Sequence, residues 1–285
     1  MKPASLLLLT AVLTMLSSDM IRSQSTSNHG NKFEQLGTLL PTPNTYRNMD
    51  GSPGPDYWQQ RVDYDIECVL DEKLNQLRGQ ERITYYNQSP STLTYLWMQL
   101  DENEHSAESD KHKMDSRQIT GVMSEDALRM LEPWRELNQY GDKIISILDE
   151  NQTPLPYTIN QTMMRVNLPH PLKPGEQFSF NVSWYYNLID RMNSTSWGRG
   201  GYEHFEKDGN SLYTIVQWYP RLCAYTDDAG WQNKQFVGRG EFALTFGNFI
   251  VKMTVPEDHI VGAVSYTHLR AHETDSYLVC RLLLE

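Results

Sequence analysis

Residues 61–70 read Arg-Val-Asp-Tyr-Asp-Ile-Glu-Cys-Val-Leu, and this stretch decides the fold. Apolar side chains stand at every second position from Val62 to Leu70, with charged side chains between most of them. Successive side chains of a strand point to opposite faces. The pattern therefore predicts a strand with one buried face and one face in water.

The same period of two recurs along the chain. Further strands are expected at 77–85, 93–100, 178–186, 242–246 and 249–255. Turn residues separate several of them, as at 87–90, 173–176 and Gly247-Asn248. Short strands with regular turns are typical of an all-β protein, an antiparallel sandwich or saddle. The one helical pattern is 124–132, where Ser124 is an N-cap residue and acids follow at once.

The N-terminal part of the chain predicts export. Residues 1–23 combine Lys2, an apolar run at 5–13 and a polar end, which is typical of a signal peptide. The alternative is a membrane anchor or a buried helix, but the run is shorter than the about 20 residues that a bilayer requires. We therefore expect a periplasmic or extracellular protein without a transmembrane anchor. Residues 24–55 are polar and predict a flexible tether before one domain at 56–263.

The last segment, Val264–Glu285, has a different character. Residues 264–274 and 278–285 resemble the two translated fixed blocks of a sequencing-library adapter, with a variable barcode at 275–277. We expect this tail to be an artefact without native structure. His268, His272 and Glu273 have a metal-like spacing, but in such a tail they have no function.

Charge and cysteine content narrow the possible partners. The formal net charge is −11 and no basic cluster is present, so nucleic acid is not an expected partner. Three cysteines do not make a disulfide framework. Whether Cys68 and Cys223 pair stays open at this point.

Four segments, in this order, resemble the N-terminal domain of the aminopeptidase N family of zinc peptidases. They are 57–85, which opens Tyr-Trp-Gln-Gln-Arg; 163–186, with Leu-Lys-Pro-Gly-Glu; 217–231, which opens Gln-Trp-Tyr-Pro-Arg; and 249–256. The resemblance covers nearly the whole predicted domain.

The resemblance implies an enzyme that removes N-terminal residues from peptide substrates. Its catalytic domain holds zinc through H-E-x-x-H, beside a G-x-M-E-N strand. Neither motif is present in this sequence. We therefore expect an inactive fragment that docks on a missing catalytic domain, which would carry the zinc. The alternative is a free-standing secreted module that binds proteins or carbohydrates.

One residue is a candidate for substrate binding. In the family, a Gln or Glu of this domain accepts a hydrogen bond from the α-ammonium group of the substrate, and Gln217 is the matching residue. The alternative is an ordinary solvent-facing Gln. Asp227 and Asp228 are interpreted as turn formers rather than catalytic or metal-binding acids, with Arg221 as a partner for one of them.

Other polar clusters are given structural roles. Tyr202, His204 and Phe205 are interpreted as packing residues, although they are also candidates for the side of the active site. His170 and His259 stand alone without metal-ligand spacing, so we expect no metal site in this chain. The charged stretch 101–117 is expected to be a surface excursion.

Overall fold

The computed structural model describes residues 44–113, 122, 124–125, 139–192, 200–238, 244–262 and 276–280, with only the backbone at 112–113 and 276–280. The predicted signal peptide, the tether up to residue 43 and most of the predicted helix at 124–132 lie outside these residues.

Strands dominate the described residues. In chain order they are β1 (Arg61–Asp71), β2 (Gln76–Tyr86), β3 (Leu93–Gln99), β4 (Lys143–Asp149), β5 (Tyr157–Asn160), β6 (Met163–Leu172), β7 (Gln177–Asn187), β8 (Gly201–Phe205), β9 (Asn210–Thr214), β10 (Arg221–Leu222), β11 (Tyr225–Thr226), β12 (Gly230–Trp231), β13 (Phe249–Thr254) and β14 (Ser276–Cys280). The helical pieces are the 3-10 helix η2 (Asp101–His105) and the one-turn helix α2 (Asp110–Lys113).

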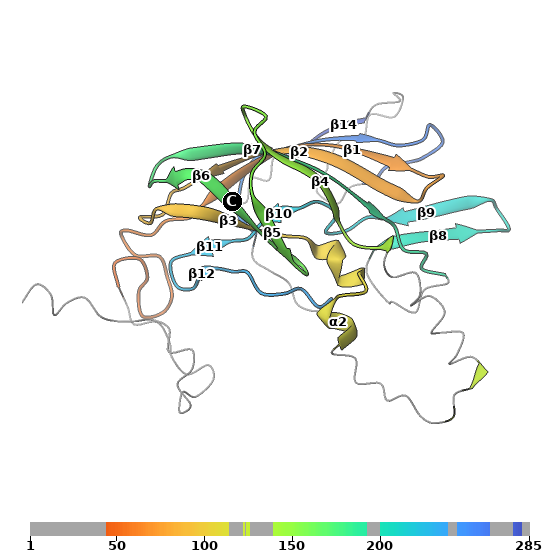
Figure 1. The fold of residues 1–285 in the computed structure, drawn as a ribbon, viewed down its shortest axis with the longest axis horizontal. Coiled ribbons are helices and arrows are strands. Elements are labelled where there is room, and N and C mark those ends of the chain that lie inside the picture. Colours follow the sequence, from red (N-terminus) through yellow and green to blue (C-terminus); the bar gives the residue numbers. More distant parts are fainter. Residues whose placement is uncertain are drawn as a thin grey trace, which may run out of the picture. The chain divides into compact units, whose positions relative to one another are not determined.

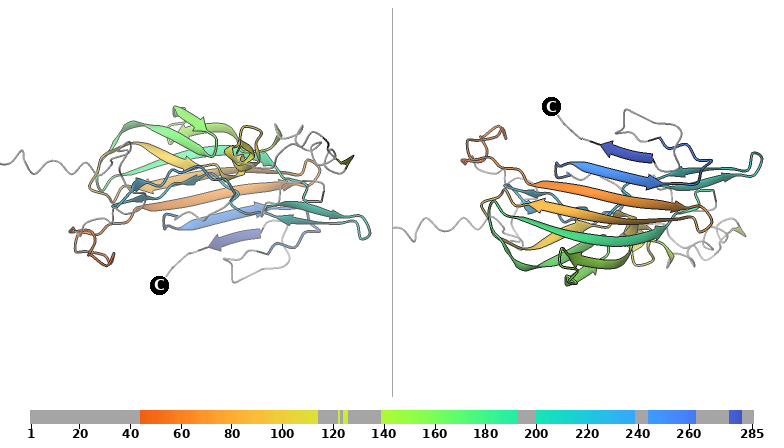
Figure 2. Two further views of the ribbon diagram at one scale, coloured as in Figure 1. Left: turned by 90° about the horizontal axis from the view of Figure 1, so that it is seen from below. Right: turned by 90° about the horizontal axis from the view of Figure 1, so that it is seen from above.

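Two sheets form the sandwich. The larger has the order β14-β13-β1-β2-β7-β4, and Figure 2 (right) shows its strands side by side. The smaller has the order β10-β3-β6-β5 and lies below it in Figure 1. Every pairing within these two sheets is antiparallel except β1 with β13, which is parallel. Two small hairpins, β8-β9 and β11-β12, complete the structure. The prediction of an all-β sandwich is confirmed.

The inner face of the six-stranded sheet follows the predicted alternation. In β1 the buried positions are 62, 64, 66, 68 and 70. In β2 and β7 they include Ile83, Tyr85, Phe180, Val182 and Trp184, each fully buried. Burying an aliphatic or aromatic side chain of this size contributes roughly 1.5–3 kcal/mol. The alternation seen in the sequence is therefore the main source of stability of this layer.

One glycine on this face makes room for a large side chain. Gly79 of β2 pairs with Trp184 of β7. A Cβ atom at Gly79 would collide with the indole ring of Trp184. A side chain at position 79 would therefore push the Trp184 indole out of its place on the inner face.

The four-stranded sheet supplies the other layer of the core. Leu96, Met98, Met164 and Val166 of β3 and β6 are completely buried. At the edge of this sheet β10 pairs with β3, so that Arg221 lies opposite Gln99 and Leu222 opposite Met98.

Part of the predicted tether is held by local hydrogen bonds. The side chain of Asn44 accepts hydrogen bonds from the backbone N–H groups of Tyr46 and Arg47, at 2.8 and 2.9 Å. Arg47 also forms a backbone bridge with Pro53. The polar residues that predict a tether can equally form tight turns of this kind, which a composition argument does not detect.

The final strand, β14, falls in the segment expected to have no native structure. Its backbone pairs antiparallel with β13 from Met253↔Ser276 to Phe249↔Cys280. An edge strand presents unpaired N–H and C=O groups to any extended segment. The pairing therefore does not test where the tail comes from, and its interpretation as an adapter stays a prediction.

Candidate functional site

The segment Gln217–Trp231, which contains β10, β11 and β12, joins the two layers of the sandwich. The ring of Trp218 packs on Trp184 at a centroid distance of 6.0 Å, and the ring of Tyr219 meets Tyr64 edge-on at 5.4 Å. The hydroxyl of Tyr64 accepts a hydrogen bond from the backbone N–H of Leu222 at 2.9 Å. Aromatic contacts with the larger sheet and strand pairing with the smaller sheet thus fix the path of this segment.

Gln217, the predicted substrate-binding residue, opens the segment in an unusual conformation. Its φ angle is +50°, in the left-handed region. Three other non-glycine residues among those described have positive φ, and all of them lie in turns between consecutive strands: Asn75, Gln152 and Gln161. Gln217 instead follows β9 at a bend and is half-buried. Such a backbone costs on the order of 1 kcal/mol, and it persists only where the surroundings enforce it.

A group of carboxyl groups lies inside the sandwich near this segment, and we call it the interior acidic cluster: Glu81, Asp101, Glu102 and Asp142. Glu81 projects from the centre of β2, between the buried cross-strand neighbours Ile66 and Val182. Both of its carboxyl oxygens are buried and lack a hydrogen-bond partner among the described residues. The buried hydroxyl of Tyr186 on β7 lacks one as well.

Three members of the interior acidic cluster, Glu81, Glu102 and Asp142, have raised pKa values. Burial raises the pKa of Glu81 well above its usual range, and the nearby Asp142 raises it further. Burial also raises the pKa of Asp142 to about 8, with Asp101 adding to the rise. Burial and the neighbouring acids raise the pKa of Glu102 in the same way. Desolvation disfavours the charged form of an acid, so these groups are held in their neutral forms.

Arg221 provides the positive charge next to the cluster. Its Nη2 atom lies 2.6 Å from Oδ2 of Asp101, and both side chains are almost completely buried. The expectation that Arg221 pairs with Asp227 or Asp228 is therefore wrong. Strand β10 places Arg221 opposite Gln99 at the end of β3, and Asp101 follows that strand end directly.

The stretch 101–117 was expected on the surface, but its first part, η2, is largely buried, while Ala107 and Glu108 are exposed. Asp101, Asn103, Glu104 and His105 of η2 are all buried. Glu104 accepts contacts from Nε2 of His105 at 3.1 Å and from Nζ of Lys111 at 3.2 Å. Burial opposes its ionisation, but these partners outweigh burial and lower the pKa of Glu104. Polar groups can be buried when they are paired. Their burial produces no periodic pattern in the sequence, so it is not predicted from the sequence alone.

Glu102, a member of the interior acidic cluster, lies near Gly200. A Cβ atom at Gly200 would lie 3.9 Å from Oε1 of Glu102 and 3.4 Å from Cγ2 of Val216, the residue before Gln217. Glu102 is half-buried by surface area. The sequence analysis missed this residue, because its only signal was an acid in a charged stretch.

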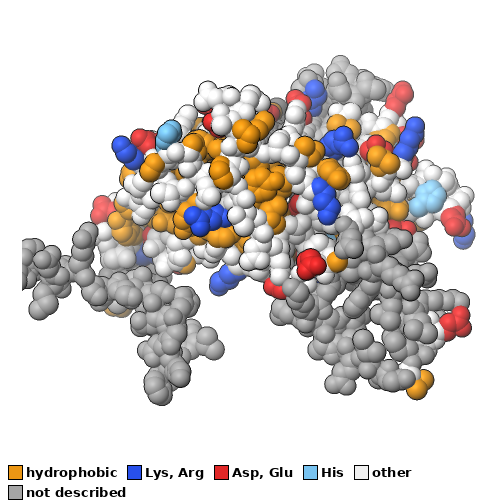
Figure 3. Space-filling model, viewed as in Figure 1, with side chains coloured by type: hydrophobic (Ala, Val, Ile, Leu, Met, Phe, Trp, Pro, Cys, Tyr) orange, Lys and Arg blue, Asp and Glu red, His pale blue; other side chains and the backbone are white. Residues whose placement is uncertain are grey.

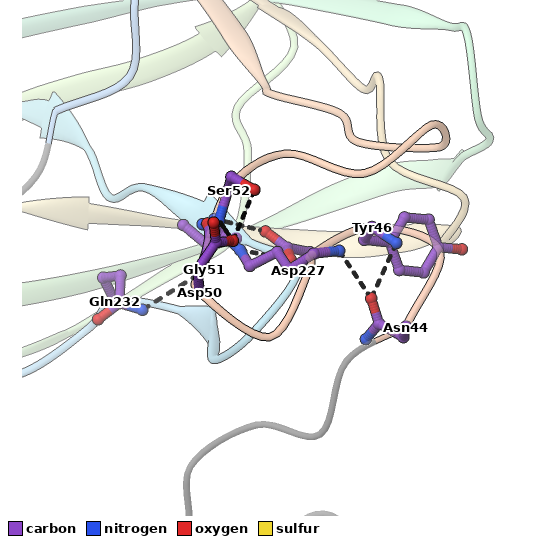
Figure 4. A network of polar contacts seen from close by, with 9 residues as sticks. Asn44, Tyr46, Asp50, Gly51, Ser52, Asp227 and Gln232 are labelled. Carbon is purple, nitrogen blue, oxygen red and sulfur yellow. Dashed lines mark hydrogen bonds and ion pairs between the residues drawn. The ribbon is translucent and has the colours of Figure 1, made fainter.

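Asp227 has a structural partner far away in the sequence. Its carboxylate receives two hydrogen bonds from Arg47, from Nε at 2.7 Å and from Nη2 at 2.8 Å. Figure 4 shows Asp227 within the network of the Asn44–Ser52 turn. A bidentate ion pair between a guanidinium group and a carboxylate is one of the stronger kinds of hydrogen-bonded ion pair. Asp227 thus holds the N-terminal turn in place, and its carboxylate is engaged by Arg47 rather than free for catalysis or metal binding.

The remaining sequence candidates have structural roles. Tyr202 and Tyr213 stack across the β8-β9 hairpin at 5.9 Å, while His204 and Phe205 are exposed on it. Cys68 and Cys223 are both free and buried, and burial raises the pKa of each thiol to about 12. A thiol that stays protonated is a poor nucleophile. No disulfide forms between them.

Three ligand-type side chains meet elsewhere, at the opposite end of β1 from Arg61. One potential ligand atom from each of Glu72, Asp258 and His259 lies within 4.8 Å of the others.

The visible surface is mixed in character. Figure 3 shows hydrophobic side chains gathered over the four-stranded sheet, with Lys, Arg, Asp and Glu scattered singly around them. Tyr95 and Trp97 of β3 are half-buried, and Arg165 of β6 lies over the Tyr95 ring at 4.1 Å. Among the described residues, no helix has the length and hydrophobicity that a bilayer crossing requires.

Comparisons with known proteins gave structural neighbours only. No family model matches the sequence, and no curated protein matches it. The structure is similar to an M1 zinc metallopeptidase from Deinococcus radiodurans, with 12% sequence identity, a TM-score of 0.40, and coverage of 80% of this chain and 41% of that one. A two-domain M1 zinc metallopeptidase variant bound to L-tryptophan aligns with 13% identity and a TM-score of 0.41. The chain spans about 40% of the length of these neighbours.

Proposed function

We propose that this chain is the N-terminal domain of an exported zinc aminopeptidase, and that Gln217 binds the free α-ammonium group of the peptide substrate. The fragment supplies an interface and amine recognition, and the zinc belongs to a catalytic domain that this sequence does not include. The sequence has no H-E-x-x-H motif. The catalytic zinc is therefore not assigned to any residue of this chain.

The observation that carries the proposal is the packing of the four family-like segments on one another. The first forms β1 and β2, and the second forms β6 and β7, with β7 paired to β2 along its whole length. The third packs its aromatic rings on β1 and β7, and the fourth forms β13, which pairs with β1. Four segments that are separated in the sequence thus form one core, as expected if they belong to a single domain.

The conformation of Gln217 supports a binding role for its side chain. A left-handed backbone at a non-glycine residue outside a tight turn is uncommon, and such residues concentrate at functional sites. The amide oxygen of Gln217 is a neutral acceptor, suited to an ammonium group. Glu102 and the preceding residue Val216 both lie near Gly200, and the Glu102 carboxyl group would strengthen the attraction if a cation approached it.

The first experiment is to sequence the source gene beyond codon 263 and to express the complete protein. The proposal expects G-x-M-E-N and then H-E-x-x-H downstream, and release of N-terminal residues from peptides by the purified protein. A native stop codon shortly after codon 263 would refute it and favour the secreted binding module.

The second experiment tests Gln217 in that complete enzyme. A hydrogen bond to a charged group contributes about 1.5–3 kcal/mol. Gln217→Ala is therefore expected to lower kcat/KM for peptides with a free N-terminus by about 10- to 100-fold. Gln217→Glu should retain most of the activity, since a carboxylate also accepts from an ammonium group.

Gln217→Gly separates the side chain from the backbone. Glycine adopts a positive φ without strain, so this variant should be as inactive as Gln217→Ala but more stable, by roughly 1 kcal/mol. Equal kcat/KM values for the wild type and Gln217→Ala would rule out the assigned role, whatever the gene encodes downstream.

A further inference from the structure

Three loop residues from distant parts of the sequence converge beside the β8-β9 hairpin. Glu72 lies in the turn between β1 and β2, while Asp258 and His259 follow β13. Figure 1 shows the end of β1 beside β9, and a hydrogen bond from the Tyr213 hydroxyl to Oδ1 of Asn75, 3.0 Å long, joins the two elements. No metal site was expected at His259, because it stands alone in the sequence without metal-ligand spacing; Glu72 comes near it only in the folded chain.

The distances fit coordination of a metal ion. One potential ligand atom of each residue lies within 4.8 Å of the other two. Nδ1 of His259 is 3.2 Å from Oδ1 of Asp258. Two ligand atoms at the usual zinc distances of about 2.0–2.1 Å lie about 3.3 Å apart in a tetrahedral site. Closure around an ion requires only a small movement of the Glu72 side chain, which is exposed.

Within the described residues, the contact partner of the Asp258 carboxylate is the imidazole of His259, at 3.2 Å. Among the described residues, neither Glu72 nor Asp258 forms an ion pair with Lys or Arg. The Nε2 atom of His259 is buried and has no hydrogen-bond partner in the described part of the chain. Two neighbouring carboxylates repel each other, and a buried nitrogen without a partner costs free energy. A divalent cation bound at Nδ1 and the two carboxylates would offset this repulsion.

The surroundings hold the imidazole in place. Its ring packs against Tyr213 of β9 at a centroid distance of 5.6 Å, and the backbone N–H of His259 donates to Pro256 at 3.0 Å. Asn75, in the turn that carries Glu72, accepts from the same Tyr213. Supporting contacts of this kind orient metal ligands in proteins.

We infer that Glu72, Asp258 and His259 form a binding site for a divalent transition metal of the zinc class. A donor set of one imidazole and two carboxylates favours zinc, cobalt or nickel over calcium or magnesium, which prefer oxygen donors alone. The ion would connect the β1-β2 turn to the segment after β13, with the Tyr213 end of β9 packed beside it. This site is independent of the zinc assigned to the missing catalytic domain.

Zinc titration of the full chain tests the site. All proteins carry His268→Ala and His272→Ala, so that the tail histidines do not contribute. Zinc affinity is measured by competition with a chromophoric chelator, and thermal unfolding is followed with and without zinc, because an ion that binds only the folded state raises Tm. His259→Ala and Asp258→Asn are each expected to weaken zinc binding at least about tenfold and to abolish the rise in Tm.

His170→Ala is the matched control, since His170 is exposed and no potential ligand in the described part of the chain is grouped with it. This variant should bind zinc like the parent protein. Asp258 has a largely exposed side chain, so Asp258→Asn should fold even if His259→Ala does not. The inference is overturned if the parent chain fails to bind zinc, or if Asp258→Asn and His170→Ala bind zinc equally well.

Discussion

Two positions on β2, only two residues apart, lie in opposite kinds of interior. Ile83 is surrounded by apolar and aromatic neighbours, with Tyr64 on one side and Phe180 on the other. Glu81 lies on the same face and is buried to the same degree, but the interior acidic cluster is near it. The region around Ile83 is stabilised by burial of apolar surface alone. The region around Glu81 is stable only while its carboxyl groups are neutral or paired.

The largest expected effect separates these regions by pH. The pKa of Asp142 rises from an ordinary 3.8 to about 8 in the folded protein. A raised pKa means that the folded state binds the proton more tightly. The stabilisation is therefore complete below about pH 4 and is lost as the pH rises through about 8, by up to about 5 kcal/mol. Urea unfolding of the full chain between pH 4 and 9 measures this change.

Asp142→Asn is the control for that experiment. The amide cannot ionise, so the decline in stability with pH should lose the share of Asp142 and become shallower, while Glu81 and Glu102 still contribute the rest. A wild-type stability that stays constant from pH 4 to 9 would show that the cluster is charged or hydrated, and the distinction between the two regions would disappear.

The next largest effect concerns the buried ion pair. Arg221→Ala removes the guanidinium group that pairs with Asp101. Removing one partner of a buried pair costs about 3–5 kcal/mol, because the other charge stays buried. Chemical denaturation at pH 7 measures the loss. The double variant Arg221→Met, Asp101→Leu should recover much of it, and a double variant less stable than Arg221→Ala alone would contradict this account.

The smallest effect tests the apolar region. Ile83→Val removes one buried methylene and should cost about 0.5–1.5 kcal/mol. Because no ionisable group is altered, the cost should be the same at pH 5 and pH 8. A cost that depends on pH would mean that Ile83 and the interior acidic cluster are coupled, and that the two regions act as one.

The same two regions explain how much of the molecule the sequence predicts. Alternation identified the strands around Ile83, because apolar burial on one face of a strand produces a period of two. Burial of η2 was not predicted, because its polar groups are neutralised by partners such as Lys111 and, for Asp101, Arg221. Such pairing depends on strand order and register, which residue type does not encode.

The candidate site divides in the same way. Gln217 was selected by family resemblance, and its left-handed backbone appears only in the folded chain. Glu102 and the group at Glu72 were missed, since each depends on segments that approach one another in space. Nothing in the local sequence indicates that Glu102 lies near the glycines at 200–201.

The parallel pairing of β1 with β13 sets the order in which this protein can form. Tyr64 pairs with Phe249, and Val69 with Thr254. The edge of β1 therefore stays unpaired until β13 has been synthesised. During synthesis on a ribosome, β1 and β2 emerge long before β13 and leave one edge of their sheet open to other chains. Contacts that span so much of the chain also slow folding. Until β13 is synthesised, this edge of β1 can pair with an extended segment of another chain.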